Sequence, residues 1–109
     1  MKIDPRKIVR HKFGAIKCQR DGKKFQSRLE RAYYDQLMLR QKAGEVLFFL
    51  MQVPFSIPGG KHFVDFQVFL SDGTVEFVET KGLDLPIGKL KRKAVEKIYP
   101  IEIKVITKV

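Results

Sequence analysis

The segment His62–Gly82, HFVDFQVFLSDGTVEFVETKG, constrains the fold of this chain more than any other stretch. β-branched and aromatic residues fill both halves of the segment, and Ser71–Gly73 between them has the composition of a tight turn. The pattern predicts a β-hairpin. Three charged residues interrupt its apolar strands, namely Asp65, Glu79 and Lys81. Charges in such strands are unfavourable unless they are paired, exposed at a strand end or needed for chemistry.

The length of the turn decides whether these charges meet. A three-residue loop over Ser71–Gly73 places Asp65 directly opposite Glu79, so that their side chains share one face of the hairpin. A two-residue turn would send the two carboxylates to opposite faces, because strand side chains alternate with a period of two. We expect the three-residue loop. Lys81 follows Glu79 by two residues and therefore projects from the same face.

Two carboxylates held close together repel each other unless a cation neutralises them. Oxygen-rich sites of this kind suit Mg²⁺ or Mn²⁺, and a neighbouring lysine can orient or deprotonate a water or stabilise charge on a phosphate. The alternative is a surface ladder of ion pairs formed by Asp65, Glu79 and Lys81, which contributes little to stability. The spacing by itself leaves both interpretations open.

The chain length and net charge limit the class of protein. We expect residues 1–109 to form a single domain with a modest core. Lysine and arginine number 22 against 12 acidic residues, and the net charge of +10 favours nucleic acid as a partner over an anionic membrane surface. No apolar run approaches the roughly 18 residues needed to cross a bilayer, and the N-terminus lacks the apolar core of a signal peptide. These features predict an intracellular, cytoplasmic protein that does not bind membranes.

Residues 1–24 form a basic arm, which is either a phosphate-binding segment or a solvated tail. A short hairpin around Asp21-Gly22 is weakly indicated within it. We expect Cys18 to be a small filler residue, because a single cysteine cannot form an internal disulfide. The two histidines, His11 and His62, do not indicate a zinc site.

A helix is predicted after this arm. Ser27–Glu30 fits a capping box, in which the glutamate bonds back to the amide at the start of the helix. The apolar residues Leu29, Tyr33 and Leu37 recur at helical spacing, and Gly44 ends the segment as a C-cap. On these residues alone, capping is the favoured role of Glu30, and a functional role is the alternative.

The segment from Glu45 to Val53 is predicted to be a strand that Pro54 closes, followed by a loop over Phe55–Gly60. Its continuous apolar run predicts a strand that is covered on both faces and central in the sheet. Exposed aromatic residues here are candidates for a subunit contact, namely Phe48, Phe49 and Phe55.

A second helix is predicted over about residues 87–99, followed by a strand from Ile101 to about Thr107. Its apolar positions are expected to face the sheet: Ile87, Leu90, Ala94, Val95 and Ile98. The opposite face is expected to expose cations for phosphate binding: Lys89, Lys91, Arg92, Lys93 and Lys97. A right-handed crossover through this helix would pair the flanking strands in parallel. The predicted fold class is therefore α/β (α+β), with a mixed sheet of four to five strands flanked by helices.

The ordered set of motifs resembles the PD-(D/E)XK nuclease superfamily from about Asp21 to Val105. Ser27–Arg31 is similar to the first-helix motif of archaeal-type Holliday-junction resolvases and of small phage resolvase-like nucleases. Phe77–Gly82 is similar to the catalytic strand of phage junction-resolving endonucleases. Val64 stands where a proline often precedes the motif aspartate.

The resemblance implies a restriction-endonuclease-like core and a role for each matching residue. Asp65 and Glu79 would bind Mg²⁺, for which Mn²⁺ would substitute, with the Thr80 carbonyl as a further ligand. Lys81 would be the catalytic lysine. Glu30 would complete the metal site, a role expected to need a different rotamer from capping.

The resemblance also implies an endodeoxyribonuclease that resolves Holliday junctions and other branched DNA, with roles in recombination and repair. Cutting a four-way junction symmetrically calls for a C2 homodimer. The candidate DNA-binding residues are Lys12, Lys17, Arg20, Lys23, Lys24, Arg28, Arg31, Gln52, Lys89, Arg92 and Lys93. The alternatives are a superfamily nuclease for mismatches, flaps or ends, and a non-catalytic basic module that binds nucleic acid.

Overall fold

The computed structural model describes residues 19, 20 and 22–109. Most of the predicted basic arm, including Lys12, Lys17 and Cys18, lies outside the described residues, as does the side chain of Arg20. The predicted short hairpin is present around Gly22, where β1 (Gln19–Arg20) pairs antiparallel with β2 (Lys23–Lys24).

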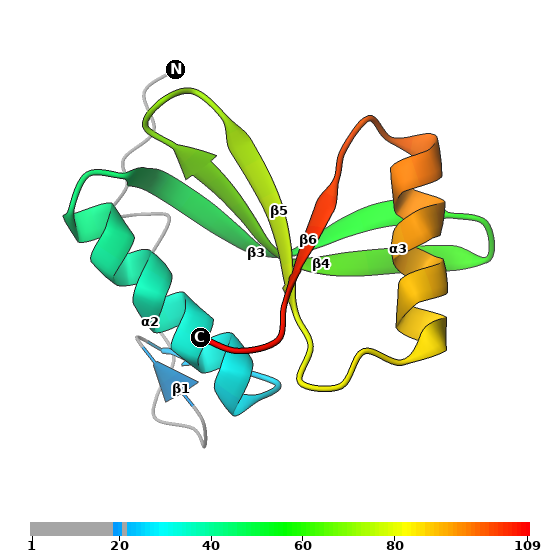
Figure 1. The fold of residues 1–109 in the computed structure, drawn as a ribbon, viewed down its shortest axis with the longest axis horizontal. Coiled ribbons are helices and arrows are strands. Elements are labelled where there is room, and N and C mark those ends of the chain that lie inside the picture. The colour runs from blue at the N-terminus through cyan, green and yellow to red at the C-terminus, as the bar shows by residue number, and fades with distance from the viewer. Residues whose placement is uncertain (1–18, 21) are drawn as a thin grey trace.

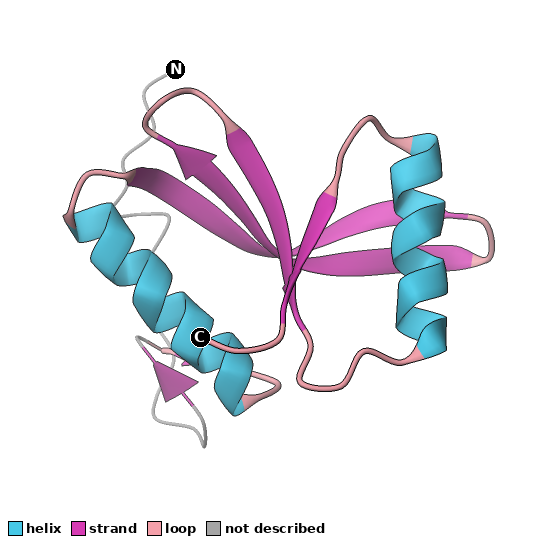
Figure 2. Ribbon diagram, viewed as in Figure 1, coloured by secondary structure: helices cyan, strands magenta, loops and turns pink. Residues whose placement is uncertain are grey.

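A mixed four-stranded sheet forms the centre of the described structure (Figures 1 and 2). Its strands lie in the order β3 (Val46–Ile57), β4 (Gly60–Leu70), β5 (Val75–Thr80) and β6 (Ile103–Ile106). The twisted sheet runs between α2 (Arg28–Lys42) and α3 (Pro86–Ile98), which Figure 1 shows toward opposite ends of the sheet. β5 and β6 pair in parallel through the crossover helix α3. This arrangement confirms the predicted fold class.

The β4–β5 hairpin has the predicted three-residue loop. Leu70 N donates to Thr74 O at 2.9 Å, Gly73 N donates to Leu70 O at 3.0 Å, and Gly73 has a φ of +92°. Such a left-handed conformation carries little steric cost in glycine. The paired residues run from Phe69–Val75 to Phe66–Val78, and one further step in this register would set Asp65 opposite Glu79.

β3 differs from its prediction, because it is an edge strand and continues four residues past Val53. Pro54 pairs with Phe63 inside the strand. An edge position tolerates proline, since its missing N–H can face away from the neighbouring strand. Leu47 and Leu50 remain exposed on β3, so the apolar run does not mark a strand covered on both faces.

α2 begins and ends as predicted. The Ser27 side chain accepts a hydrogen bond from Glu30 N at 3.0 Å. At the other end, Gly44 has a φ of +85° and its N–H donates to Gln41 O at 3.1 Å. This is the hydrogen-bonding pattern of a glycine-terminated helix.

The sheet packs into two apolar clusters, one at each helix. The α2 cluster comprises Phe25, Tyr33, Tyr34, Leu37, Val46, Phe49, Phe66, Val68 and Val78. The α3 cluster comprises Val64, Val95 and Ile103, with Phe55, Ile57, Phe77, Tyr99 and Ile101 packed against them. Neighbouring residues of β5, Phe77 and Val78, join different clusters, which follows from strand alternation. Residues near the middle of β3 and β4 therefore lie where the two clusters meet.

The aromatic residues proposed for a subunit contact are not exposed. Phe49 is buried next to Tyr34, with ring centroids 5.5 Å apart. Phe48 is half-buried and stacks on Phe69. Phe55 is half-buried between other rings of the α3 cluster. These side chains serve the packing of the sheet itself, so the expectation that they are exposed is wrong.

The orientation of α3 also corrects the prediction. Ile87, Leu90 and Ile98 are exposed, whereas Arg92 is only 6% exposed. The helix turns Arg92 and Val95 toward the sheet, because the guanidinium meets carboxylates there. The lysines predicted on the outer face are exposed as expected, namely Lys89, Lys91, Lys93 and Lys97.

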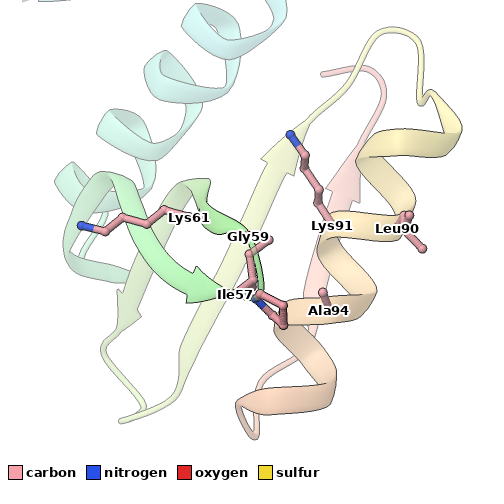
Figure 3. Close-up of a pocket in the computed structure, with 8 residues that line it drawn as sticks. Ile57, Gly59, Lys61, Leu90, Lys91 and Ala94 are labelled. Atoms are coloured by element: carbon pink, nitrogen blue, oxygen red, sulfur yellow. The ribbon is translucent and has the colours of Figure 1, made fainter.

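The tip of the β3–β4 hairpin and α3 border a pocket of about 350 Å³ (Figure 3). It is lined by Ile57–Lys61 on the hairpin and by Leu90, Lys91 and Ala94 on α3. None of the predicted catalytic carboxylates lines it. In the described part of the chain, neither α2 nor α3 has the length and apolar character needed to cross a bilayer.

Candidate active site

Asp65 links the three neighbouring strands β3, β4 and β5. Its Oδ2 accepts hydrogen bonds from Thr80 N at 2.9 Å and from Thr80 Oγ1 at 3.1 Å. Its Oδ1 accepts a hydrogen bond from Gln52 Nε2 at 3.1 Å. The carboxylate is buried, and these donors fix its orientation.

Gln52 lies opposite Asp65 in the register of β3 and β4, between the pairs Met51–Phe66 and Val53–Val64. Its φ is +51°, the one positive value among the described non-glycine residues. A non-glycine residue in this conformation carries strain of about 1–3 kcal/mol, and such strain often lies at functional sites. The conformation accompanies a side chain whose amide donates both to Asp65 and to Glu30 Oε2, the latter at 2.9 Å. The sequence left Gln52 open between ending strand pairing, positioning a water near a metal site and contacting DNA, and the structure places its amide between two carboxylates.

Glu30 lies in the first turn of α2 and is buried beside Gln52 and Asp65. We call Glu30, Asp65 and Glu79, with the linking side chain of Gln52, the carboxylate cluster. Its Oε1 accepts a hydrogen bond from Gln26 N at 2.8 Å, while its Oε2 accepts the bond from Gln52. One rotamer therefore serves the helix terminus and the cluster together. The bond at the helix terminus differs from the predicted capping box, because Glu30 accepts from the Gln26 amide and not from that of the N-cap residue Ser27. Burial raises the pKa of Glu30, and the nearby charge of Asp65 raises it further.

Glu79 is 0% exposed, and only one of its two carboxylate oxygens has a hydrogen-bond contact among the described residues. Its Oε2 lies 2.6 Å from His62 Nε2, and its Oε1 has no hydrogen-bond partner among the described residues. Lys81 Nζ and Arg92 Nη1 each lie 3.9 Å from Oε1, too far for a hydrogen bond. Burial raises the pKa of Glu79, the contact with His62 opposes this rise, and the charge of Asp65 adds to it.

Lys81 stands at the open side of the cluster. Its backbone N–H donates to Ile106 O at 2.9 Å, which fixes the chain at the end of β5. Its side chain is half-exposed. The ammonium charge opposes the raised pKa of both Glu30 and Glu79, so its field reaches carboxylates from two different elements. The residues predicted to be catalytic are thus brought together by the fold.

Arg92 and Asp84 extend the cluster toward α3. Arg92 Nη2 donates to Asp84 Oδ2 at 2.6 Å, whereas Arg92 Nη1 and Asp84 Oδ1 are buried without hydrogen-bond partners in the described structure. Arg92 was predicted on the exposed phosphate-binding face, and its burial corrects that placement.

Sequence reasoning missed His62 and Asp84. Alternation along a flat strand would place His62 on the face opposite to Asp65, so the sequence carries no signal that His62 reaches Glu79. Asp84 lies in the segment between β5 and α3, and its partner Arg92 had been expected to face outward.

Comparison with known proteins gives a family without a described activity. A family model described as "Protein of unknown function (DUF1064)" matches residues 10–109. The chain belongs to the DUF1064 family. No curated protein and no solved structure matches it.

The donor atoms in this DUF1064 protein can be compared with the needs of a magnesium ion. Among the described residues, no three His, Cys, Asp or Glu side chains lie so as to hold a metal by themselves. Mg²⁺ is usually bound by one or two carboxylates and keeps several waters, so it does not need such a cage. The unpartnered buried Oε1 of Glu79, beside the charge of Asp65, provides a carboxylate oxygen in a suitable environment. The residues present fit Mg²⁺ on this chemistry.

The predicted DNA-binding residues of the DUF1064 protein are distributed over two regions. Arg28 and Arg31 lie in the first turn of α2, beside the buried Glu30, with Arg28 exposed and Arg31 half-buried. Lys24 is exposed, and burial lowers the pKa of Lys23. The exposed lysines of α3 form the second region. Cations thus lie on both helices that border the carboxylate cluster.

Proposed function

We propose that this DUF1064 protein is a metal-dependent endodeoxyribonuclease of the PD-(D/E)XK type that cuts four-way DNA junctions. The observation that supports the proposal most is the hydrogen-bonded connection of Glu30, Gln52, Asp65 and Thr80, with Glu79 and Lys81 next to it. A buried, strained and mutually repulsive set of polar groups is costly to maintain for stability alone. Such costs are typical of active sites.

Asp65, Glu79 and the Thr80 carbonyl are the groups that would hold Mg²⁺ or Mn²⁺. When bound, the ion supplies Lewis-acid polarisation of a phosphoryl oxygen and neutralises the carboxylates. Glu30 acts through Gln52, whose amide donates to both acidic side chains and so keeps Asp65 in one orientation. This arrangement sets the carboxylates before substrate arrives, which reduces reorganisation during the reaction.

Lys81 is the residue placed to meet the phosphate and the attacking water. Its half-exposed ammonium can donate to a phosphate oxygen on which negative charge develops. Its distance of 3.9 Å from Glu79 Oε1 leaves its N–H groups free of that carboxylate. The lysine would thereby orient the water and stabilise charge, while the carboxylates would hold the cation.

Branched DNA fits the surface chemistry of the chain. The net charge of +10 and the exposed lysines of α3 favour contacts with phosphates, which do not read base sequence. A four-way junction presents two strands for symmetric cleavage, and a homodimer would bring one active site to each. Replacing Lys89 and Lys93 by alanine should weaken junction binding and flatten its salt dependence, by about 0.9 in log–log slope for each lost phosphate contact.

The deciding assay measures nicking of a synthetic four-way junction and of a linear duplex with the same arm sequences, with Mg²⁺ and with EDTA. We expect cleavage of the junction only, and only with the metal ion. Lys81→Ala should lose this cleavage. Lys104→Ala is the matched control, because Lys104 is an exposed lysine whose ion pair with Glu76 lies outside the cluster. Equal cutting of both substrates, or cutting that survives EDTA, would remove the junction-nuclease assignment.

A further inference from the structure

The contact between His62 and Glu79 has no assigned role in the proposed reaction. His62 lies in β4, and its side chain is 11% exposed. Its Nε2 is 2.6 Å from Glu79 Oε2, and no other hydrogen bond to the Glu79 carboxylate is found among the described residues. When Glu79 is ionised, the ring nitrogen donates and the carboxylate accepts.

The two oxygens of Glu79 therefore differ sharply. Oε2 is hydrogen-bonded to the imidazole of His62 on the neighbouring strand, whereas Oε1 is buried without a hydrogen bond. An unsatisfied buried acceptor destabilises a fold, so an Oε1 without a hydrogen bond is unfavourable unless a ligand or water uses it. The cations nearest to Oε1, Lys81 and Arg92, stay at 3.9 Å.

Without His62, Glu79 would have no hydrogen bond to hold its rotamer. The carboxylate would then be free to turn toward Arg92 or Lys81, since a direct charge-assisted hydrogen bond is stronger than a contact at 3.9 Å. Either rotation would take an oxygen away from the position that it now occupies. The hydrogen bond to the imidazole thus determines that Oε2 is the bound oxygen and that Oε1 has no hydrogen bond.

We propose that His62 is a positioning residue, which holds Glu79 through Oε2 so that Oε1 stays available to the metal ion. The inference rests on the proposed function, because it assigns Glu79 Oε1 to the ion. The inference adds His62, which lies outside the matched motifs, as a residue that acts through Glu79 and not on the phosphate directly. Groups that hydrogen-bond to metal ligands typically change metal affinity by about 10–100-fold when they are replaced.

The test compares His62→Leu, which removes the N–H donor, with His62→Gln, which keeps one. Calorimetry with Mn²⁺ on the DNA-free protein should give a Kd about 10–100-fold weaker for His62→Leu. The turnover rate of His62→Leu on the junction should fall as its Mn²⁺ affinity falls, while KM for the junction stays unchanged. His62→Gln should restore most of both. Phe63→Leu is the matched control, because it places a leucine at the neighbouring half-exposed position of β4 and should leave both values unchanged.

The outcomes separate this inference from the proposed function. Absence of cleavage by the wild-type protein would overturn the nuclease assignment and the inference with it. Normal wild-type cleavage combined with unchanged Mn²⁺ affinity in His62→Leu would overturn the inference alone. Equal impairment of His62→Leu and His62→Gln, with a matching fall in Tm, would show a purely structural histidine and would also overturn it. In the metal-free protein, Glu79→Gln should shift the ¹⁵N resonance of His62 Nε2, and an unchanged resonance would contradict the contact.

Discussion

The two helices each bury one charged side chain beside the candidate site, but they satisfy it differently. On α2, each carboxylate oxygen of Glu30 accepts a hydrogen bond, one from the backbone and one from Gln52. On α3, Arg92 donates through Nη2 to Asp84, while its Nη1 is buried without a hydrogen-bond partner in the described structure. The α2 charge is fully satisfied, and the α3 charge keeps unused hydrogen-bonding capacity.

The packing of the two helices follows the same division. α2 contributes Tyr33, Tyr34 and Leu37 to a large buried cluster, whereas Val95 is the buried apolar residue of α3. Leu90 on α3 is 65% exposed. Apolar burial therefore fixes α2, whereas α3 depends more on the charged side chains that meet between it and the sheet. The first-turn carboxylate is therefore positioned by a helix with a large buried apolar face, and the guanidinium is held by its ion pair with Asp84.

Arg92→Leu should give the largest loss of stability. The substitution keeps an apolar side chain of moderate size but leaves Asp84 and the fully buried Glu79 without their guanidinium partner. Removing one partner of a buried ion pair typically costs about 3–5 kcal/mol. Urea unfolding of the metal-free protein measures the loss. Lys93→Leu is the control on the exposed face of α3, and a loss as large as that of Arg92→Leu would contradict the role given to the buried ion pair.

A matched pair of leucine substitutions tests the packing difference directly. Leu37→Ala on α2 removes a side chain that is 0% exposed and should cost about 2–5 kcal/mol. Leu90→Ala on α3 removes a mostly exposed side chain and should change the free energy of unfolding by less than about 0.5 kcal/mol. The same urea experiment measures both. Similar losses for the two variants would mean that α3 packs through Leu90, as the sequence pattern had predicted.

Glu79→Gln should give a smaller, pH-dependent gain in stability in the metal-free protein. Burial raises the pKa of Glu79 in the folded state above its ordinary value of 4.5. The protonated side chain therefore stabilises the fold fully below pH 4.5, and this stabilisation is lost as the pH rises through the raised pKa. Glutamine stays neutral, so the variant should melt higher than wild type at pH 7, and the difference should shrink as pH falls toward 4. A gain of about 1 kcal/mol corresponds to a rise of about 4–8 °C in a small domain. A lower Tm for the variant at pH 7 would show that the surrounding cations outweigh burial.

The sequence predicted those parts of the fold that depend on local patterns. The N-cap at Ser27, the glycine after α2 and the loop at Ser71–Gly73 are short-range signals, and all three are present. The edge position of β3 depends on strand order, which a run of apolar residues does not encode. The orientation of α3 was wrong for the same reason, because Arg92 is buried by partners on other segments.

The candidate site divides in the same way. The register of the β4–β5 hairpin was predictable from the turn, and the charge of Asp65 acts on Glu79 as that register would require. The hydrogen bond between Gln52 and Glu30 requires α2 to pack beside β3. The left-handed backbone conformation of Gln52 was not predictable, because glycine is the usual sequence signal for it. His62 on β4 reaches Glu79 on the neighbouring strand β5 against the alternation expected for a flat sheet. Long-range geometry of this kind is visible only in the folded chain.

The most direct test of the active-site assignment is single-turnover cleavage of a four-way junction by Asp65→Asn in Mg²⁺, with junction binding measured in parallel. Asparagine retains an oxygen to accept the hydrogen bonds from Thr80, so the fold should persist. We predict that cleavage falls below detection while the Kd for the junction stays the same or tightens. Cleavage at the wild-type rate would contradict the account, because Asp65 would then hold no ion that the reaction needs.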